Sequence, residues 1–123
     1  MKTILIIEDE EIMLDLLQRK ISASGYRVLI AGNGEEGLAI LRKEKPDLIV
    51  MDLLMPKMDG FTMMKEVQGD EDLKKIPLII VSNSGQPVEL DEAKKLGARD
   101  WLIKAEFDPQ ELIDKIRVQL NER

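Results

Sequence analysis

The sequence contains no cysteine and no histidine among its 123 residues. The lack of cysteine excludes disulfides, thiolate zinc sites and thiol nucleophiles. The lack of histidine excludes Ser-His-Asp hydrolysis, imidazole metal ligands and carriage of a phosphoryl group on histidine. Any metal site in this chain must therefore be built from oxygen ligands.

Long apolar runs and positive charge are also scarce. No apolar run approaches the ~18 residues needed to span a bilayer, and the N-terminus shows no signal-peptide pattern, so we expect no membrane association and a cytoplasmic location. The net charge of −6 and pI of 4.8 argue against direct binding of nucleic acid, which requires a basic face. With 44% hydrophobic and 34% charged residues, the chain is expected to fold as one domain over residues 1–123.

Apolar runs alternate with amphipathic stretches along the whole chain, which predicts five repeats of a strand followed by a helix. Three of the runs are nearly continuous, as expected for a parallel sheet that helices cover on both faces. The predicted fold class is therefore α/β, with an open, doubly wound, five-stranded parallel sheet. The expected strands are Ile4–Ile7, Val28–Ala31, Leu48–Met51, Leu78–Val81 and Trp101–Ile103.

Five amphipathic stretches are expected to form helices. The first follows Asp9, the last follows Asp108, and the others cover residues 34–44, 60–69 and 88–96. The first helix carries an apolar stripe that should face the core, formed by Ile12, Leu16, Leu17 and Ile21.

Polar residues stand where four of the five apolar runs end. Glu8 and Asp9 follow the first run, Asp52 the third, Ser82 the fourth and Lys104 the fifth. The carboxyl ends of parallel strands share one edge, and ligands of such sheets bind there. If the strand order is 2-1-3-4-5, the three carboxylates meet in the crevice between the first and third strands. Carboxylates so placed repel one another, and a hard divalent cation, best Mg²⁺, would neutralise them.

Asp52 is the best-placed of these carboxylates for covalent chemistry, because apolar Met51 and Leu53 flank it. Its attack on phosphorus would give an aspartyl phosphate. Mg²⁺ would offset the charge that develops as the phosphoryl group moves. Lys104 would add a second cation, and Ser82 would add a hydroxyl that can donate to a phosphoryl oxygen.

Three motifs carry a family resemblance that spans the chain, namely Ile7 to Glu10, Met51 to Gly60 and Asp100 to Lys104. They resemble the receiver domains of response regulators in two-component signalling, the CheY-like family. The spacing of the hydroxyl and the lysine from the aspartate also resembles that of the family. The resemblance implies a flavodoxin/CheY-like sheet of order 2-1-3-4-5, with residues 1–123 forming a single receiver domain.

The resemblance also implies a reaction and a metal site. Asp52 would accept a phosphoryl group from a sensor histidine kinase. Mg²⁺ would bind Asp9, Asp52 and the backbone carbonyl of Leu54, with Glu8 acting mainly through water.

Further site residues follow from the same resemblance. Ser82 and Lys104 would contact the phosphoryl group. Ser82 and Trp101 would form the switch that shifts the surface made by the fourth helix, fifth strand and fifth helix. Leu54 and Ser84 occupy positions that tune the lifetime of the phosphoryl group in the family.

Two residues depart from the family pattern. Asn83 stands where a small apolar residue is usual, and Ala105 stands where a proline usually follows a cis peptide bond. A cis bond to a non-proline residue costs about 2.5–4 kcal/mol, so we expect the Lys104–Ala105 bond to be trans. Both departures leave open how fully the switch operates.

The sequence thus predicts a phosphoacceptor switch, not a turnover enzyme, because transfer ends on a residue of the chain itself and self-dephosphorylation is slow. One alternative is a pseudo-receiver that acts as a phosphorylation-independent protein-interaction module, which Asn83 and Ala105 keep open. Another is a flavodoxin-like FMN binder. An FMN phosphate would need amide donors after the first strand, where this chain has the four acids Glu8 to Glu11.

The expected partners are proteins. A sensor histidine kinase would supply the phosphoryl group, and a downstream protein or an output domain would receive the signal. We expect a monomer before phosphorylation, with dimerisation on phosphorylation as the alternative.

Overall fold

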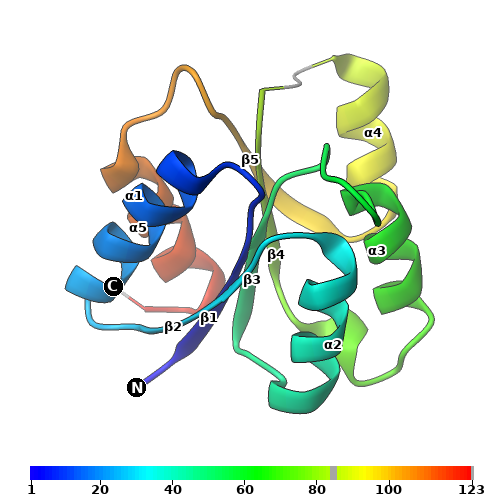
Figure 1. The fold of residues 1–123 in the computed structure, drawn as a ribbon, viewed down its shortest axis with the longest axis horizontal. Coiled ribbons are helices and arrows are strands. Elements are labelled where there is room, and N and C mark those ends of the chain that lie inside the picture. The colour runs from blue at the N-terminus through cyan, green and yellow to red at the C-terminus, as the bar shows by residue number, and fades with distance from the viewer. Residues whose placement is uncertain (84–85, 123) are drawn as a thin grey trace.

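The computed structural model describes residues 1–83 and 86–122, in which one parallel sheet runs through the molecule (Figure 1). Its strand order is β2-β1-β3-β4-β5, as predicted. The predicted strands are all present, and four of them start earlier or end later than expected. Their bounds are β1 Thr3–Ile7, β2 Arg27–Ala31, β3 Leu48–Met51, β4 Leu78–Ser82 and β5 Ala98–Ile103.

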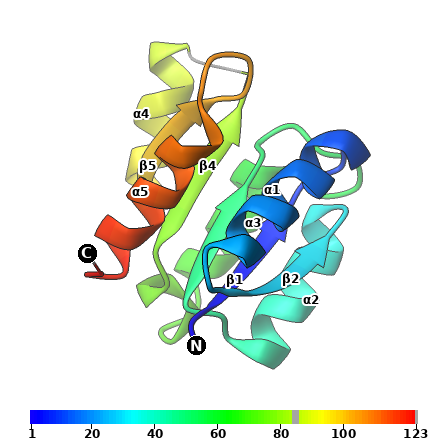
Figure 2. The same ribbon diagram turned by 90° about the vertical axis from the view of Figure 1, so that its left-hand side faces the viewer.

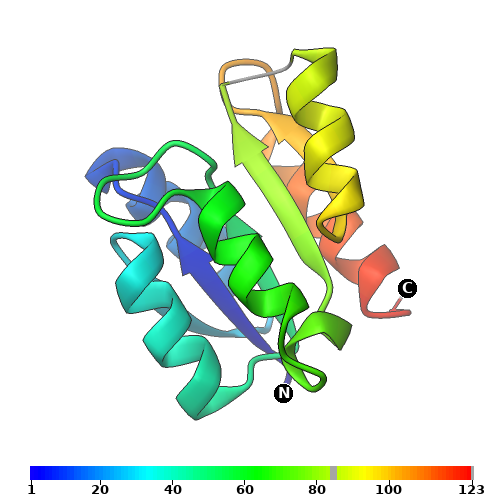
Figure 3. The same ribbon diagram turned by 90° about the vertical axis from the view of Figure 1, so that its right-hand side faces the viewer.

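Helices cover both faces of the sheet. Figure 2 shows α1 and α5 side by side on one face, and Figure 3 shows α2, α3 and α4 on the other. A short 3₁₀ helix, η1, lies between α3 and β4 and was not predicted. The helix bounds are α1 Glu11–Ala23, α2 Gly34–Glu44, α3 Gly60–Gln68, η1 Leu73–Lys75, α4 Pro87–Lys95 and α5 Pro109–Gln119. No helix in the described part of the chain is long and apolar enough to cross a membrane.

The apolar strands are buried because helices cover them on both sides. Every residue of β3 and β4 is buried, which explains why their sequences are nearly continuous apolar runs. Successive side chains of a strand point to opposite faces, so the core divides into two clusters. Leu5, Ile7, Ile49 and Met51 pack toward α2 and α3, whereas Ile4, Ile6, Leu48 and Val50 pack toward α1 and α5.

Two of the four α1 residues that were predicted to face the core do not face it. Ile12 is 89% exposed and Leu16 is 43% exposed, whereas Leu17 and Ile21 are buried. The helix carries apolar residues on two adjacent faces, and periodicity alone does not say which of them meets the sheet. The face that packs against the sheet and α5 is formed by Met13, Leu14, Leu17 and Ile21.

The turn after β5 contains the Lys104–Ala105 peptide bond. No peptide bond among the described residues is cis, so the Lys104–Ala105 bond is trans, as predicted. The N–H groups of Glu106 and Phe107 both donate to the carbonyl of Ile103, at 3.0 and 3.1 Å. This turn carries the chain from Lys104 to the start of α5.

Candidate functional site

Four of the five polar residues predicted at the strand ends are buried at one edge of the sheet. Glu8 follows β1, Asp52 follows β3, Ser82 ends β4 and Lys104 follows β5, and each is at most 7% exposed. The parallel order places all four carboxyl ends on the same edge. The sheet therefore brings together residues that lie as many as 96 positions apart in the sequence.

The ammonium of Lys104 is the centre of this cluster. Its Nζ lies 2.9 Å from Asp52 Oδ2, 2.8 Å from Glu8 Oε1 and 2.5 Å from Glu10 Oε1. Charged hydrogen bonds of this length are about twice as strong as neutral ones. Lys104 therefore holds three carboxylates from two separate loops close together.

The carboxylate of Asp52 is held from both sides. Oδ2 accepts from Lys104, and Oδ1 accepts from the backbone N–H groups of Leu53 and Leu54 at 2.7 and 3.4 Å. The loop between Asp52 and α3 folds back on its own start, because the N–H of Gly60 donates to the carbonyl of Leu53 at 2.8 Å. A Cβ at Gly60 would lie 2.8 Å from the carbonyl oxygen of Asp52, so a side chain there would push the loop away. Asp52 is therefore fixed in place before any ligand arrives.

Burial and ion pairing act against each other in this cluster. Burial raises the pKa of the Glu8 carboxyl, and the hydrogen bonds from Lys104 and from the Glu10 N–H only partly offset it. Burial disfavours the charge on Lys104, but its hydrogen bonds to Glu10, Glu8 and Asp52 outweigh that effect and raise its pKa. Lys104 is thus a permanent cation at physiological pH.

Glu10 is a site residue that the sequence reasoning missed. It stands at the N-terminus of α1 with an extended backbone, φ −84° and ψ 114°, and its side chain makes no capping bond to the helix. Extended backbone places side chains i and i+2 on the same side, so Glu10 points with Glu8 toward Lys104. The sequence analysis assigned Glu8 and Asp9 to the site but not Glu10. The i, i+2 spacing from Glu8 becomes a signal only once the backbone at Glu10 is known to be extended.

The donor set suits a hard cation. Glu8, Glu10 and Asp52 each offer a carboxylate oxygen, and these oxygens lie within 4.8 Å of one another. Mg²⁺ is bound in proteins by such oxygens together with water. Asp9, predicted as a ligand, is exposed and is not part of this group among the described residues. Its role and that of the Leu54 carbonyl remain predictions.

The hydroxyl-bearing residue of the site lies beside the lysine. Ser82 is buried at the end of β4, and its backbone carbonyl accepts from the N–H of Lys104 at 2.9 Å. This bond fixes the start of the Lys104 side chain next to Ser82. Ser84, predicted to tune the phosphoryl lifetime, lies outside the described residues.

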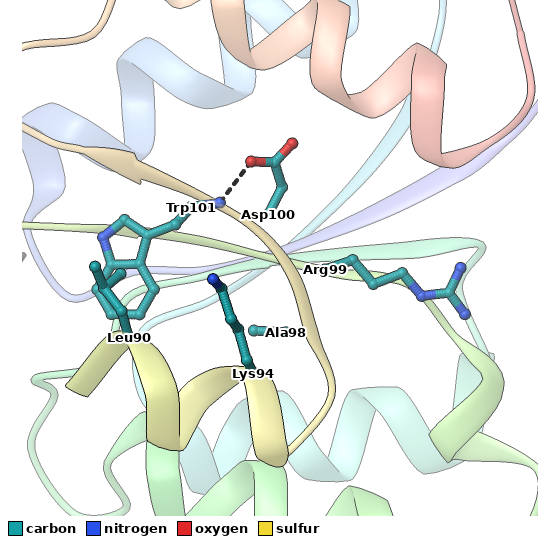
Figure 4. Close-up of a pocket in the computed structure, with 6 residues that line it drawn as sticks. All are labelled: Leu90, Lys94, Ala98, Arg99, Asp100 and Trp101. Atoms are coloured by element: carbon teal, nitrogen blue, oxygen red, sulfur yellow. Dashed lines mark hydrogen bonds between the residues drawn. The ribbon is translucent and has the colours of Figure 1, made fainter. Parts of the chain in front are cut away.

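Trp101 is half-buried on β5, beside a pocket between this strand and α4 (Figure 4). The backbone N–H of Trp101 donates to Asp100 Oδ1 at 2.8 Å, and the same oxygen accepts from Lys115 Nζ at 2.9 Å. The pocket has a volume of about 130 Å³. It is lined by Leu90, Lys94, Ala98, Arg99, Asp100 and Trp101. The surface on which the switch was predicted thus contains a cavity beside Trp101.

Comparison with known families matches nearly the whole sequence of this chain. The sequence profile of the response regulator receiver domain matches residues 4–117. The chain belongs to this family. Because the profile covers almost the whole sequence, the predicted resemblance and the CheY-like fold are both confirmed.

Relatives of this receiver include proteins of different length. It is 36% identical over 120 residues to Protein PilH of Pseudomonas aeruginosa, covering 98% of each chain. It is 37% identical over 114 residues to the probable transcriptional regulator ycf27 of Porphyra purpurea, covering 93% of this chain and 45% of that protein. The receiver therefore spans less than half the length of that regulator.

A solved structure agrees with the fold of this receiver. The chemotaxis protein CheY4 of Vibrio cholerae superposes with a TM-score of 0.91 at 30% identity, covering 98% of this chain and 99% of that one. The likeness extends over nearly the whole of both chains.

Proposed function

We propose that this receiver is a signalling switch that accepts a phosphoryl group on Asp52 in a Mg²⁺-dependent reaction. The observation that carries the proposal is the buried Asp52 carboxylate, held at 2.9 Å by Lys104 among further carboxylates at the carboxyl edge of the sheet. A carboxylate fixed in place and facing a cation is suited to receive a phosphoryl group.

In the proposed reaction, a carboxylate oxygen of Asp52 attacks the phosphorus of a phosphohistidine in a sensor histidine kinase. An oxygen–phosphorus bond forms as the phosphorus–nitrogen bond breaks, and the bonding pair of the broken bond leaves on the imidazole. Lys104 donates to a phosphoryl oxygen, and the hydroxyl of Ser82 is placed to do the same. The reaction ends on the chain itself, so we infer a switch and not a turnover enzyme.

A Mg²⁺ ion held in this cluster would supply positive charge against the negative charge that develops on the phosphoryl group during transfer. The carboxylates of Asp52, Glu8 and Glu10 support such a site by their donor chemistry. Asp9 and the Leu54 carbonyl complete the ligand set that we propose from the family resemblance. Each of these groups comes from a loop that follows a strand.

The output of the proposed switch is a protein contact. We infer that Ser82 and Trp101 couple the phosphoryl group to the surface of α4, β5 and α5. A downstream protein, or an output domain in a longer chain, would read that surface. We further infer a cytoplasmic protein that is monomeric until it is phosphorylated.

The test is transfer from a small phosphodonor. Wild type, Asp52→Asn and Asp91→Asn are incubated with acetyl phosphate and Mg²⁺, and their intact masses are followed. Asp91 lies exposed on α4, so its variant controls for the loss of an aspartate. We expect wild type and Asp91→Asn to gain one phosphoryl group, and Asp52→Asn to gain none.

Three results would contradict the proposal. A folded wild type that gains no mass from acetyl phosphate or from a panel of kinases would favour a phosphorylation-independent interaction module. Equal gain in Asp52→Asn and wild type would place the acceptor elsewhere. A purified protein with the yellow colour of a flavin would instead favour FMN binding.

A further inference from the structure

Glu10 differs from the other two carboxylates on Lys104 in its exposure to solvent. The Glu8 and Asp52 side chains are 2% and 7% exposed, whereas the Glu10 side chain is 59% exposed. Glu10 also lies on the helix side of the site, immediately before α1, and its side chain makes no capping bond. The ammonium therefore binds two buried carboxylates and one exposed carboxylate.

The ammonium has no donor left for a further ligand while it is bound in this way. A lysine carries three N–H donors. In this structure Nζ lies within hydrogen-bonding distance of three carboxylates: Glu8, with Oε1 at 2.8 Å and Oε2 at 2.9 Å, Glu10 Oε1 at 2.5 Å and Asp52 Oδ2 at 2.9 Å. Lys104 can therefore donate to a phosphoryl oxygen only if it releases one of the three carboxylates.

Burial decides which carboxylate is released most easily. A buried carboxylate that loses its hydrogen bond has no water to replace it, which is strongly unfavourable. An exposed carboxylate is solvated as soon as it leaves, and exposed ion pairs are weak for that reason. Glu8 is also tied to the Glu10 N–H at 3.0 Å, which holds it in the site. Glu10 is the partner that exchanges at the smallest loss of free energy.

We propose that Glu10 is a positioning residue that holds the Lys104 ammonium over Asp52 in the resting state and gives it up when a phosphoryl group arrives. This inference rests on the proposed function, because it assigns a competitor for the lysine of the phosphoacceptor site. The proposal predicts that Glu10 slows phosphorylation of Asp52, because the Glu10–Lys104 contact must break before Lys104 can bind the incoming phosphoryl group.

The resting contact can be tested without metal or phosphodonor. Proton exchange of the Lys104 ammonium is measured by nitrogen-15 NMR in metal-free protein, with its signal assigned through the side-chain carbons. Glu11→Gln is the matched control, because it removes one negative charge from the neighbouring exposed position. We expect faster exchange in Glu10→Gln and wild-type exchange in Glu11→Gln. Equal exchange rates in the three proteins would overturn the proposal.

The competition is tested by transfer to the same three proteins. Glu10 is also one of the carboxylates proposed to support the Mg²⁺ site, so Mg²⁺ is titrated to saturation for each protein separately. Initial rates with acetyl phosphate should then be roughly two- to fivefold higher in Glu10→Gln than in Glu11→Gln, the range expected for an ion pair with one exposed partner. Each variant loses one negative charge, so the comparison removes the general effect of charge on an anionic donor. If wild type is phosphorylated but the two variants have equal rates, the role of Glu10 is overturned and the proposed function is not. A wild type that takes up no phosphoryl group would overturn the proposed function.

Discussion

Lys104 Nζ lies 2.9 Å from Asp52 Oδ2 although 52 positions separate the two residues in the sequence. The contact exists because β3 and β5 run parallel on either side of β4, so that both strands end at the same edge. Lys104 is nevertheless one cation among three carboxylates, and the cluster keeps a negative charge. That imbalance favours binding of a divalent cation and leaves the folded protein with buried repulsion. The negative charge that favours cation binding therefore also destabilises the folded protein, and variants of the cluster should affect the two properties differently.

Lys104→Met should destabilise the metal-free protein by about 3 kcal/mol or more, because it leaves Glu8 and Asp52 as buried charges without a partner. Urea denaturation in the presence of a chelator measures the change. Mg²⁺ should restore part of the loss, because a ligand that binds only the folded state stabilises it. Lys115→Met is the control, since its pair with Asp100 is half-exposed, and it should lose less than about 1 kcal/mol. Equal losses in the two variants would contradict this account.

Glu8→Gln should stabilise the protein at neutral pH and do so less at acid pH. Burial raises the pKa of Glu8 in the folded state above its ordinary value of 4.5. Below that ordinary value the group is protonated in both folded and unfolded states, so its ionisation has no effect on folding. As the pH rises through the folded-state pKa, wild type must ionise a buried group and loses stability that the neutral glutamine keeps.

The measurement for Glu8 is the free energy of unfolding of wild type and Glu8→Gln, determined in urea between pH 4 and pH 8. The difference between the two proteins should grow with pH. Glu35→Gln, at an exposed position of α2, controls for the general loss of a carboxylate. A difference that shrinks as the pH rises would show that Lys104 stabilises the ionised Glu8 more than burial disfavours it.

Gly34→Ala should destabilise the protein although it adds a better helix former. A Cβ at Gly34 would lie 2.2 Å from the carbonyl oxygen of Met58, in the loop that follows Asp52. The clash involves backbone, so the loop or α2 must move, at about 1–3 kcal/mol. At Gly32 the nearest atom to an added Cβ is 3.9 Å away, so Gly32→Ala should change stability by no more than about 0.5 kcal/mol. Thermal or urea unfolding of the two variants compares them directly, and equal effects would refute the packing argument.

The sheet was predictable because each strand carries its own signal. Buried parallel strands need continuous apolar runs, and turn residues separate them from helices whose stripes recur every three or four positions. The choice between adjacent faces of α1 was not predictable, because Ile12 and Leu16 are as apolar as Leu17 and Ile21. Contact with α5, 90 or more positions away, decides between the faces. The irregular start of β5 depends in the same way on its pairing with β4, where the register shifts.

Most residues of the site could be predicted from the sequence, but their contacts with one another could not. A carboxylate, a hydroxyl and a lysine at successive strand ends indicate chemistry at one edge, and Glu8, Asp52, Ser82 and Lys104 meet there. Glu10 was missed because four consecutive acids look alike in sequence. Only the extended backbone at Glu10 turns its carboxylate toward Lys104 and fixes it there. Helix starts with several acids therefore need the backbone conformation before their side chains can be assigned.

Leu54→Asn should shorten the lifetime of the proposed aspartyl phosphate. Leu54 lies two residues after Asp52, its N–H faces Asp52 Oδ1 at 3.4 Å, and the residue is 65% exposed. An apolar side chain there shields the phosphoryl group and offers no hydrogen bond to an attacking water, whereas an amide can orient one. The decay of phosphorylated protein, followed by intact mass after removal of the donor, should be severalfold faster in Leu54→Asn. Val88→Asn makes the same change at an exposed position on α4 and should decay at the wild-type rate. An unchanged lifetime in Leu54→Asn would mean that water reaches the phosphoryl group by a route that Leu54 does not control.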